Sequence, residues 1–147
     1  MKILLPIDGS PPALQAVQHA LQLVQEGLRA SFVLVNVQEP ASLYEMVVAH
    51  DAAVIERVRG AAGADLLAPA EALLDAAGLD YESEVAGGDP QNLLVELLEN
   101  YGCQAVVMGA QGMGGTSAAL GSVALALLHH SPVPVTVVRP PEPVEPE

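Results

Sequence analysis

The sequence predicts a single α/β domain built on an open five-stranded parallel sheet with helices on both faces. Short apolar runs rich in β-branched residues alternate with segments of helical periodicity from end to end. The apolar runs are nearly continuous, as expected of strands that are buried on both faces. The chain has 147 residues, of which 51% are hydrophobic and 16% charged, and this size and composition are typical of one globular domain.

Five segments have the composition of strands. The third is more polar than the others and alternates, which suits the edge of a sheet. Pro134 cannot donate to a ladder, so the last strand is expected at an edge or at a subunit contact. The expected strands are Lys2–Ile7, Ser31–Val37, Asp80–Ala86, Gln104–Gly109 and Val133–Val138.

Two helices begin at recognisable caps. Ser10 stands at an N-cap position with Pro11 after it, and apolar residues then repeat at helical spacing up to about Gly27. Asp89 and Pro90 open another helix in the same way, followed by four leucines on one face. Both segments are therefore expected to pack one apolar face on the sheet.

The remaining segments are less regular. The stretch Pro40–Gly78 has helical character but contains Pro69, and its sequence leaves open one long broken helix or two helices. A last helix is expected over Ser117–His130, whose two terminal histidines suit a helix C-terminus. Residues 140–147 are rich in Pro and Glu and are expected to be disordered, so that the domain covers residues 1–139.

Charge and cysteine content exclude several classes of function. The net charge is −13 with only five Lys and Arg residues, so there is no basic footprint for nucleic acid or for anionic membranes. No apolar run is long enough to span a membrane, and the N-terminus is too short and too soon interrupted for a signal peptide. Cys103 cannot form an internal disulfide, so the expected location is the cytoplasm. His50, Asp51 and Glu56 lack metal-ligand spacing, and no metal site is predicted.

The glycine-rich segment "GAQGMGGTSAALGS", which begins at Gly109, is the main candidate for a ligand site. Ligands of open parallel sheets lie beyond the carboxyl ends of the strands, where the loops after Ile7, Val37 and Met108 are expected to meet. The first of these loops carries Asp8. The glycine segment lacks the lysine of a Walker loop, and Ser117 replaces the last glycine of a dinucleotide-binding fingerprint.

The whole chain resembles the universal stress protein family. The resemblance rests on "KILLPIDGS", "LVNV", "GGDP" and "VVMGAQGMGG…LGSV…SPVPVTVV", which keep their order and spacing from Lys2 to Arg139. It implies a Rossmann-like fold of the adenine nucleotide alpha hydrolase type and a role in stress response. It also implies a homodimer joined through the last strand, Val133–Val138. In one branch of the family it implies ATP at the glycine loop, with Mg²⁺ or Mn²⁺, or alternatively AMP or ADP.

In that branch the loop follows the pattern G-x-x-G, nine residues, then G-[ST]. The resemblance makes Asp8 the acid near adenine and ribose and Val37 an apolar contact to the base. Backbone N–H groups of the glycines and the Ser122 hydroxyl can approach phosphate oxygens. The residues at matching positions are Pro6, Ile7, Asp8, Val37, Met108, Gly109, Gly112, Gly121, Ser122 and Val123.

The sequence departs from this family pattern in two ways, which leave a nucleotide-free protein as a second hypothesis. Only eight residues separate Gly112 from Gly121, and the loop contains no Lys or Arg. Asp8 can equally be a turn or cap residue, and Ser122 can bond its own helix turn. The leading hypothesis is an ATP-binding regulatory module without efficient catalysis, because no general base is evident. The alternatives are a nucleotide-free dimeric interaction module of the same fold and, more weakly, a slow ATP hydrolase.

Overall fold

Five strands form one parallel sheet in the order β3-β2-β1-β4-β5. A computed structural model of the protein describes residues 1–38, 52–111 and 120–139. The chain builds outward from β1 to one edge through β2 and β3, and then returns to add β4 and β5 on the other side of β1. The strand order therefore reverses between β1 and β4. The strands are β1 (Lys2–Pro6), β2 (Ser31–Gln38), β3 (Tyr81–Gly87), β4 (Ala105–Gly109) and β5 (Val135–Val138).

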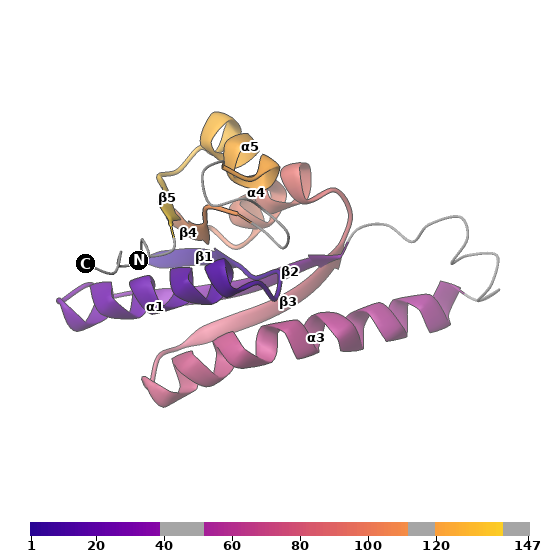
Figure 1. The fold of residues 1–147 in the computed structure, drawn as a ribbon, viewed down its shortest axis with the longest axis horizontal. Helices are drawn as coiled ribbons and strands as arrows, with labels where there is room; N and C mark the ends of the chain where they lie inside the picture. The colour runs from indigo at the N-terminus through magenta and orange to yellow at the C-terminus, as the bar shows by residue number, and fades with distance from the viewer. Residues whose placement is uncertain (39–51, 112–119, 140–147) are drawn as a thin grey trace, which may run out of the picture.

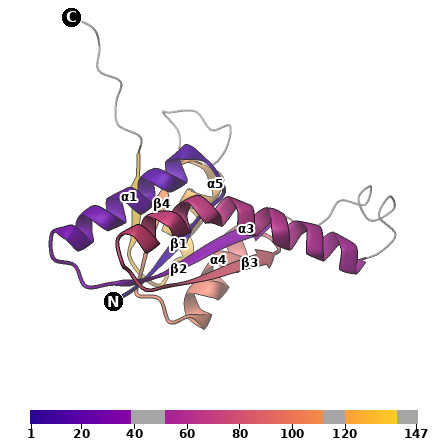
Figure 2. The same ribbon diagram turned by 90° about the horizontal axis from the view of Figure 1, so that it is seen from below.

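Helices cover both faces of this sheet, as the sequence predicts. Figure 1 shows α1 (Pro11–Gln25) and α3 (Ala52–Ala76) on one face, with α4 (Pro90–Asn100) and α5 (Ser122–His130) on the other. The first half of α3 extends past the ends of the strands, which Figure 2 shows from a second direction. We refer to the two sides as the α1/α3 face and the α4/α5 face.

Alternate residues of each strand supply two separate hydrophobic cores, because successive side chains of a strand point to opposite faces. On the α1/α3 face the largest buried side chain is that of Phe32. Buried residues of this core include Ile3, Leu5, Val17, Phe32, Leu34, Leu67 and Leu74. Buried residues of the α4/α5 core include Leu4, Val33, Val35, Leu94, Leu98, Val106 and Leu127.

The predicted edge positions of β3 and β5 are confirmed. The expected start of the last strand at Val133 is two residues too early, because β5 begins at Val135. Pro134 precedes the strand, and its carbonyl accepts a bond from the Val106 N–H at 2.9 Å. A proline can accept in a ladder although it cannot donate, so it fits at this entry point.

The helix α3 continues through Pro69 without a break. A proline removes one backbone bond and crowds the carbonyl four residues earlier, here that of Asp65. Both Asp65 and Pro69 are exposed, so water can satisfy that carbonyl. Leu67 and Leu74 hold the helix on the sheet from the other side. Packing on the sheet therefore outweighs the helix-breaking preference of Pro69. Residues 40–51, the first part of the stretch Pro40–Gly78, lie outside the described residues.

The predicted caps of α1 and α4 are confirmed. The Ser10 side chain accepts from the Ala13 N–H, and Asp89 accepts from the Gln91 N–H. The last helix begins at Ser122 rather than at Ser117, because Gly121 has an extended backbone and forms the N-cap. Ser117 itself and the predicted disordered tail 140–147 lie outside the described residues. No candidate membrane-spanning helix is found among residues 1–38, 52–111 and 120–139.

Candidate functional site

A cavity of about 500 Å³ lies at the carboxyl ends of the strands, where the loops after β1 and β4 meet. This is the point at which the strand order reverses, and open parallel sheets bind ligands there. Every predicted site residue that the structure describes lines this cavity, whereas Gly112 lies outside the described residues. The lining residues are Pro6, Ile7, Asp8, Ala13, Val35, Val37, Pro90, Leu94, Met108, Gly109, Ala110, Gln111, Gly121, Ser122, Val123 and Ala124.

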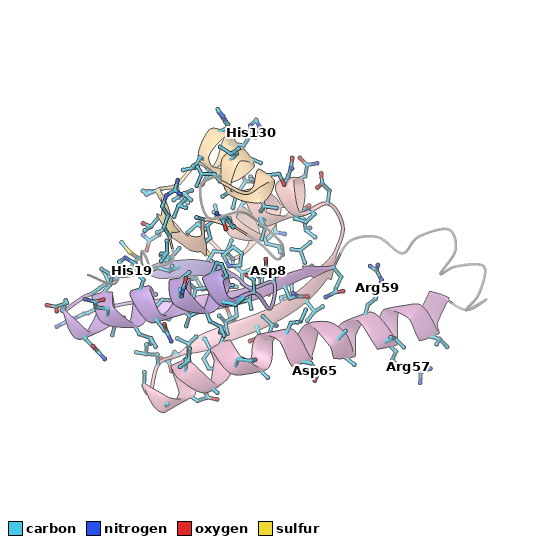
Figure 3. All side chains as sticks on the ribbon, viewed as in Figure 1. Asp8, His19, Arg57, Arg59, Asp65 and His130 are labelled. Carbon is cyan, nitrogen blue, oxygen red and sulfur yellow. The ribbon has the colours of Figure 1, made fainter. Side chains whose placement is uncertain are left out.

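The turn between β1 and α1 places Asp8 at the cavity, near the middle of the sheet (Figure 3). Its Oδ1 atom accepts from the Ser10 N–H at 2.9 Å and from the Ser10 hydroxyl. The Ser10 hydroxyl oxygen in turn accepts from the Ala13 N–H at the start of α1. Asp8 is exposed, and these bonds use only one of its two oxygens. Asp8 is therefore a turn residue whose Oδ2 can still accept a bond from a ligand.

Two glycines let other chain segments approach the cavity closely. Gly9 has a φ of +83°, and an added Cβ would lie 2.5 Å from Leu66 Cδ2 of α3. A Cβ at Gly109 would lie 2.8 Å from the backbone carbonyl carbon of Pro12. The first turn of α1 therefore packs directly on the end of β4, which brings the β1 and β4 loops together around one space.

The end of β2 forms the apolar wall of the cavity. Val35 and Val37 are two residues apart and so share the α4/α5 face. Asn36 points to the opposite face and is 2% exposed. Its Nδ2 donates to the Ile7 carbonyl at 2.8 Å, and its Oδ1 accepts from the Gln38 side chain at 2.6 Å. Asn36 thus fixes the loop after β1 from behind and is a positioning residue that the sequence analysis missed.

The helix α5 points its N-terminus at the cavity. The Gly121 N–H donates to the Ala110 carbonyl at 2.7 Å, and this bond ties the helix start to the end of β4. Ser122 and Val123 of the first turn line the cavity, and Ser122 is exposed. The first N–H groups of a helix lack partners within the helix and carry partial positive charge, so this end favours an anion.

Seven lining residues were not predicted, although the sequence holds signals for several of them. Val35 lies two residues before the predicted Val37 and so faces the same side of the sheet. Leu94 lies about one helical turn after Pro90 and so faces the same side of α4. Ala110 and Gln111 are the interior of the G-x-x-G pattern. The unpredicted lining residues are Ala13, Val35, Pro90, Leu94, Ala110, Gln111 and Ala124.

Asp8 is the single titratable side chain in the described lining. Other charged groups lie elsewhere: Lys2 pairs with Glu82 at 3.2 Å at the amino-terminal side of the sheet. Figure 3 shows Arg57 and Arg59 on the extended half of α3 and His130 at the far end of α5. The arrangement can hold an apolar planar group against valine and methionine, accept from a hydroxyl at Asp8 and receive an anion at α5. It offers no paired acid and base.

Comparison with known proteins identifies the family. Residues 1–139 match the model of the universal stress protein family. Universal stress protein MJ0531 of Methanocaldococcus jannaschii is 28% identical over 142 residues, which cover 96% of this chain and 83% of the relative. The structure of the hypothetical protein MJ0577 is similar with a TM-score of 0.81 and 22% identity, covering 97% of both chains.

A second solved structure is that of a universal stress protein in complex with cAMP. It matches with a TM-score of 0.70 and 25% identity, covering 95% of this chain and 97% of the other. The family match spans every described strand and helix, and the similar structures share the five-stranded α/β fold. The chain therefore belongs to the universal stress protein family.

Proposed function

We propose that the cavity binds an adenine nucleotide, with ATP and a divalent cation as the leading candidate, and that the protein acts in the cytoplasm as a regulatory module of the stress response. The observation that carries this proposal is the convergence of the predicted site residues on one cavity. Its volume of about 500 Å³ lies within the range of small-molecule sites. The cAMP complex of a family member supports an adenine ligand in this fold.

Each part of a nucleotide has a suitable counterpart in the lining. The base would lie in the apolar part, against Val37 and Met108. A ribose hydroxyl would donate to Asp8, because Oδ1 is engaged by Ser10 and Oδ2 remains at an exposed position. The phosphates would approach the N–H groups at the start of α5 and the hydroxyl of Ser122.

A divalent cation would arrive with the phosphates rather than occupy a protein site of its own. Among the described residues there is no group of three His, Cys, Asp or Glu side chains that could hold a metal ion. Mg²⁺ is often bound mainly by phosphate oxygens and water, so Mg²⁺ or Mn²⁺ suits a triphosphate here. AMP or ADP would place less negative charge beside Asp8 in a protein of net charge −13.

A regulatory role fits this lining better than efficient catalysis. Phosphoryl transfer to water needs a group that orients the attacking water, and Asp8 is the one titratable candidate in the described lining. Slow hydrolysis is tested by measuring phosphate release from ATP. Release at equal rates by the natural protein and by Asp8→Ala would mean that this site does not hydrolyse ATP.

Titration calorimetry with ATP and Mg²⁺, with AMP and with GTP as a comparison tests the proposal directly. Ser122→Asp is the sharpest variant, because a carboxylate at an exposed first-turn position stabilises the helix but repels phosphate. We expect it to fold normally and to lose ATP binding. Gln91→Asp is the matched control, since it adds the same charge to the first turn of α4 outside the cavity lining.

One alternative has a specific observation in its favour. The described lining contains no cation, and one oxygen of Asp8 is already engaged by its own turn. These features suit a nucleotide-free interaction module in which the glycine loop is purely structural. Absence of heat with millimolar ATP and Mg²⁺ and with AMP, on protein shown to be folded, would remove the nucleotide proposal and leave that alternative.

We also propose a homodimer formed through β5. This strand pairs only with β4 among the described residues, so its outer edge is free to pair. Leu125 and Leu128 of the neighbouring α5 are 43% and 47% exposed. Sedimentation at micromolar concentration should give twice the mass of the chain, and Leu128→Glu should lower it. Val58→Glu, at a valine of α3 that is 63% exposed, should not. A natural protein that sediments as a monomer contradicts the dimer.

A further inference from the structure

Arg139 lies immediately after β5, beside the point where the glycine loop leaves β4. The register of the two strands pairs Gly109 with Val138. The ladder continues one step further, because the Ala110 N–H donates to the Val138 carbonyl at 2.9 Å. The next residues, Ala110 and Arg139, are therefore neighbours at roughly one strand spacing of 4.8 Å.

Side-chain alternation places Arg139 on the α4/α5 face, which is the face of the cavity. Val135 and Val137 pack against the core of that face. Arg139 follows Val137 by two residues, so its side chain leaves the sheet on the same side. Ala110 lines the cavity, and its carbonyl accepts the Gly121 N–H at the start of α5. Arg139 therefore stands next to the helix terminus that would receive an anion.

The charge distribution gives this position its significance. Gly109 to Gly121 contains no Lys, Arg or His in its sequence, and the described lining contains none either. Of the other four Lys and Arg residues, Lys2 is paired with Glu82, and Arg29 precedes β2 at the opposite end of the sheet. Arg57 and Arg59 lie on α3, on the other face. Arg139 is exposed, and among the described residues no ion pair to it is found.

We propose that Arg139 is a specificity-determining residue that contacts the phosphate of the bound nucleotide and supplies the positive charge that the glycine loop lacks. This inference rests on the proposed nucleotide function. A guanidinium can bond two phosphate oxygens at once, and its long side chain can cover one strand spacing. This contact does not involve the base or the ribose, so it does not change the affinity for adenosine. Arg139 thus makes the site discriminate between AMP and adenosine.

The test compares AMP with adenosine, because the two differ only in the phosphate. The natural protein, Arg139→Gln and Arg139→Lys are titrated with each compound by calorimetry at low and at moderate salt. Arg29→Gln is the matched control: it is exposed, removes the same charge and lies at the opposite end of the sheet. The affinities of Arg29→Gln for AMP and adenosine show how far the loss of one distant positive charge weakens binding.

Arg139→Gln should weaken AMP binding by about fivefold to tenfold, leave adenosine binding unchanged and reduce the salt dependence for AMP. Arg139→Lys should recover part of the loss. An unchanged ratio of AMP to adenosine affinity in Arg139→Gln would overturn the inference while the nucleotide function stands. An equal loss in Arg29→Gln would also overturn it, because the effect would then be one of net charge. A natural protein that binds neither compound overturns the inference and the proposed function together.

Discussion

The two faces of the sheet are built from the same strands but are covered by helices of different length. On the α1/α3 face, α3 has 25 residues and its stripe of small and apolar side chains reaches the turn after β1. On the α4/α5 face, α4 and α5 have 11 and 9 residues, and both begin at the cavity. The N-terminal ends of both short helices therefore border the space that a ligand would occupy.

The close contacts behind the cavity show how the first face supports the second. Leu66 of α3 packs against Gly9, and Gly63 lies against Val85 and the Asn36 side chain. Asn36 in turn holds the Ile7 carbonyl. The α1/α3 face therefore fixes the loop that carries Asp8, while the α4/α5 face provides the space and the helix terminus for the ligand.

The largest expected effect is a difference between two identical substitutions, one on each face. Leu34 and Leu94 are both buried, but Leu34 belongs to the α1/α3 core and Leu94 lines the cavity. We expect Leu34→Ala to lower the free energy of unfolding by about 4 kcal/mol and Leu94→Ala by about 2 kcal/mol, since less packing is lost beside an existing space. Urea denaturation measures both. Equal losses would mean that the two faces are packed alike.

A smaller effect is expected where the faces meet. Gly109→Ala would place a Cβ 2.8 Å from the Pro12 backbone, so either α1 or β4 must shift. We expect a loss of about 1–3 kcal/mol and weaker nucleotide binding, because the cavity loops would separate. Gly60→Ala in α3 is the control: its Cβ meets nothing within 4 Å, and it should stabilise the protein by about 0.5–1 kcal/mol. Unchanged stability of Gly109→Ala, measured by thermal unfolding, would contradict the close approach.

The smallest effect concerns the far end of the α4/α5 face, away from the cavity. Cys103 is 5% exposed there, and burial raises the pKa of its thiol. Its modification by a thiol reagent at pH 8 should therefore be at least about tenfold slower than in urea. Because the unfolded thiol ionises first, this group should lower the stability slightly as the pH rises above about 8.5. A fast reaction in the folded protein would show that this end is as open as the other.

Much of the site could be predicted because its residues belong to local patterns. The cap at Ser10, the proline after Asp89 and the glycines around β4 act through their own backbone geometry, which depends on a few neighbouring residues. The predicted edge position of the last strand followed from Pro134 in the same way. The sequence placed the start of the last helix at Ser117, because serine can cap or continue a helix. The helix α5 begins instead at Ser122, after Gly121 bonds to the Ala110 carbonyl.

The element types, the parallel sheet and the set of loops that meet at its carboxyl edge follow from the amino-acid sequence, because hydrophobic periodicity and caps are properties of short segments. Three other features are visible only in the folded protein: α3 runs unbroken through Pro69, Asn36 holds the Ile7 carbonyl, and Arg139 stands beside Ala110. Each of the three depends on contacts between residues far apart in the chain. They depend on the packing of one element on another, which no local pattern encodes.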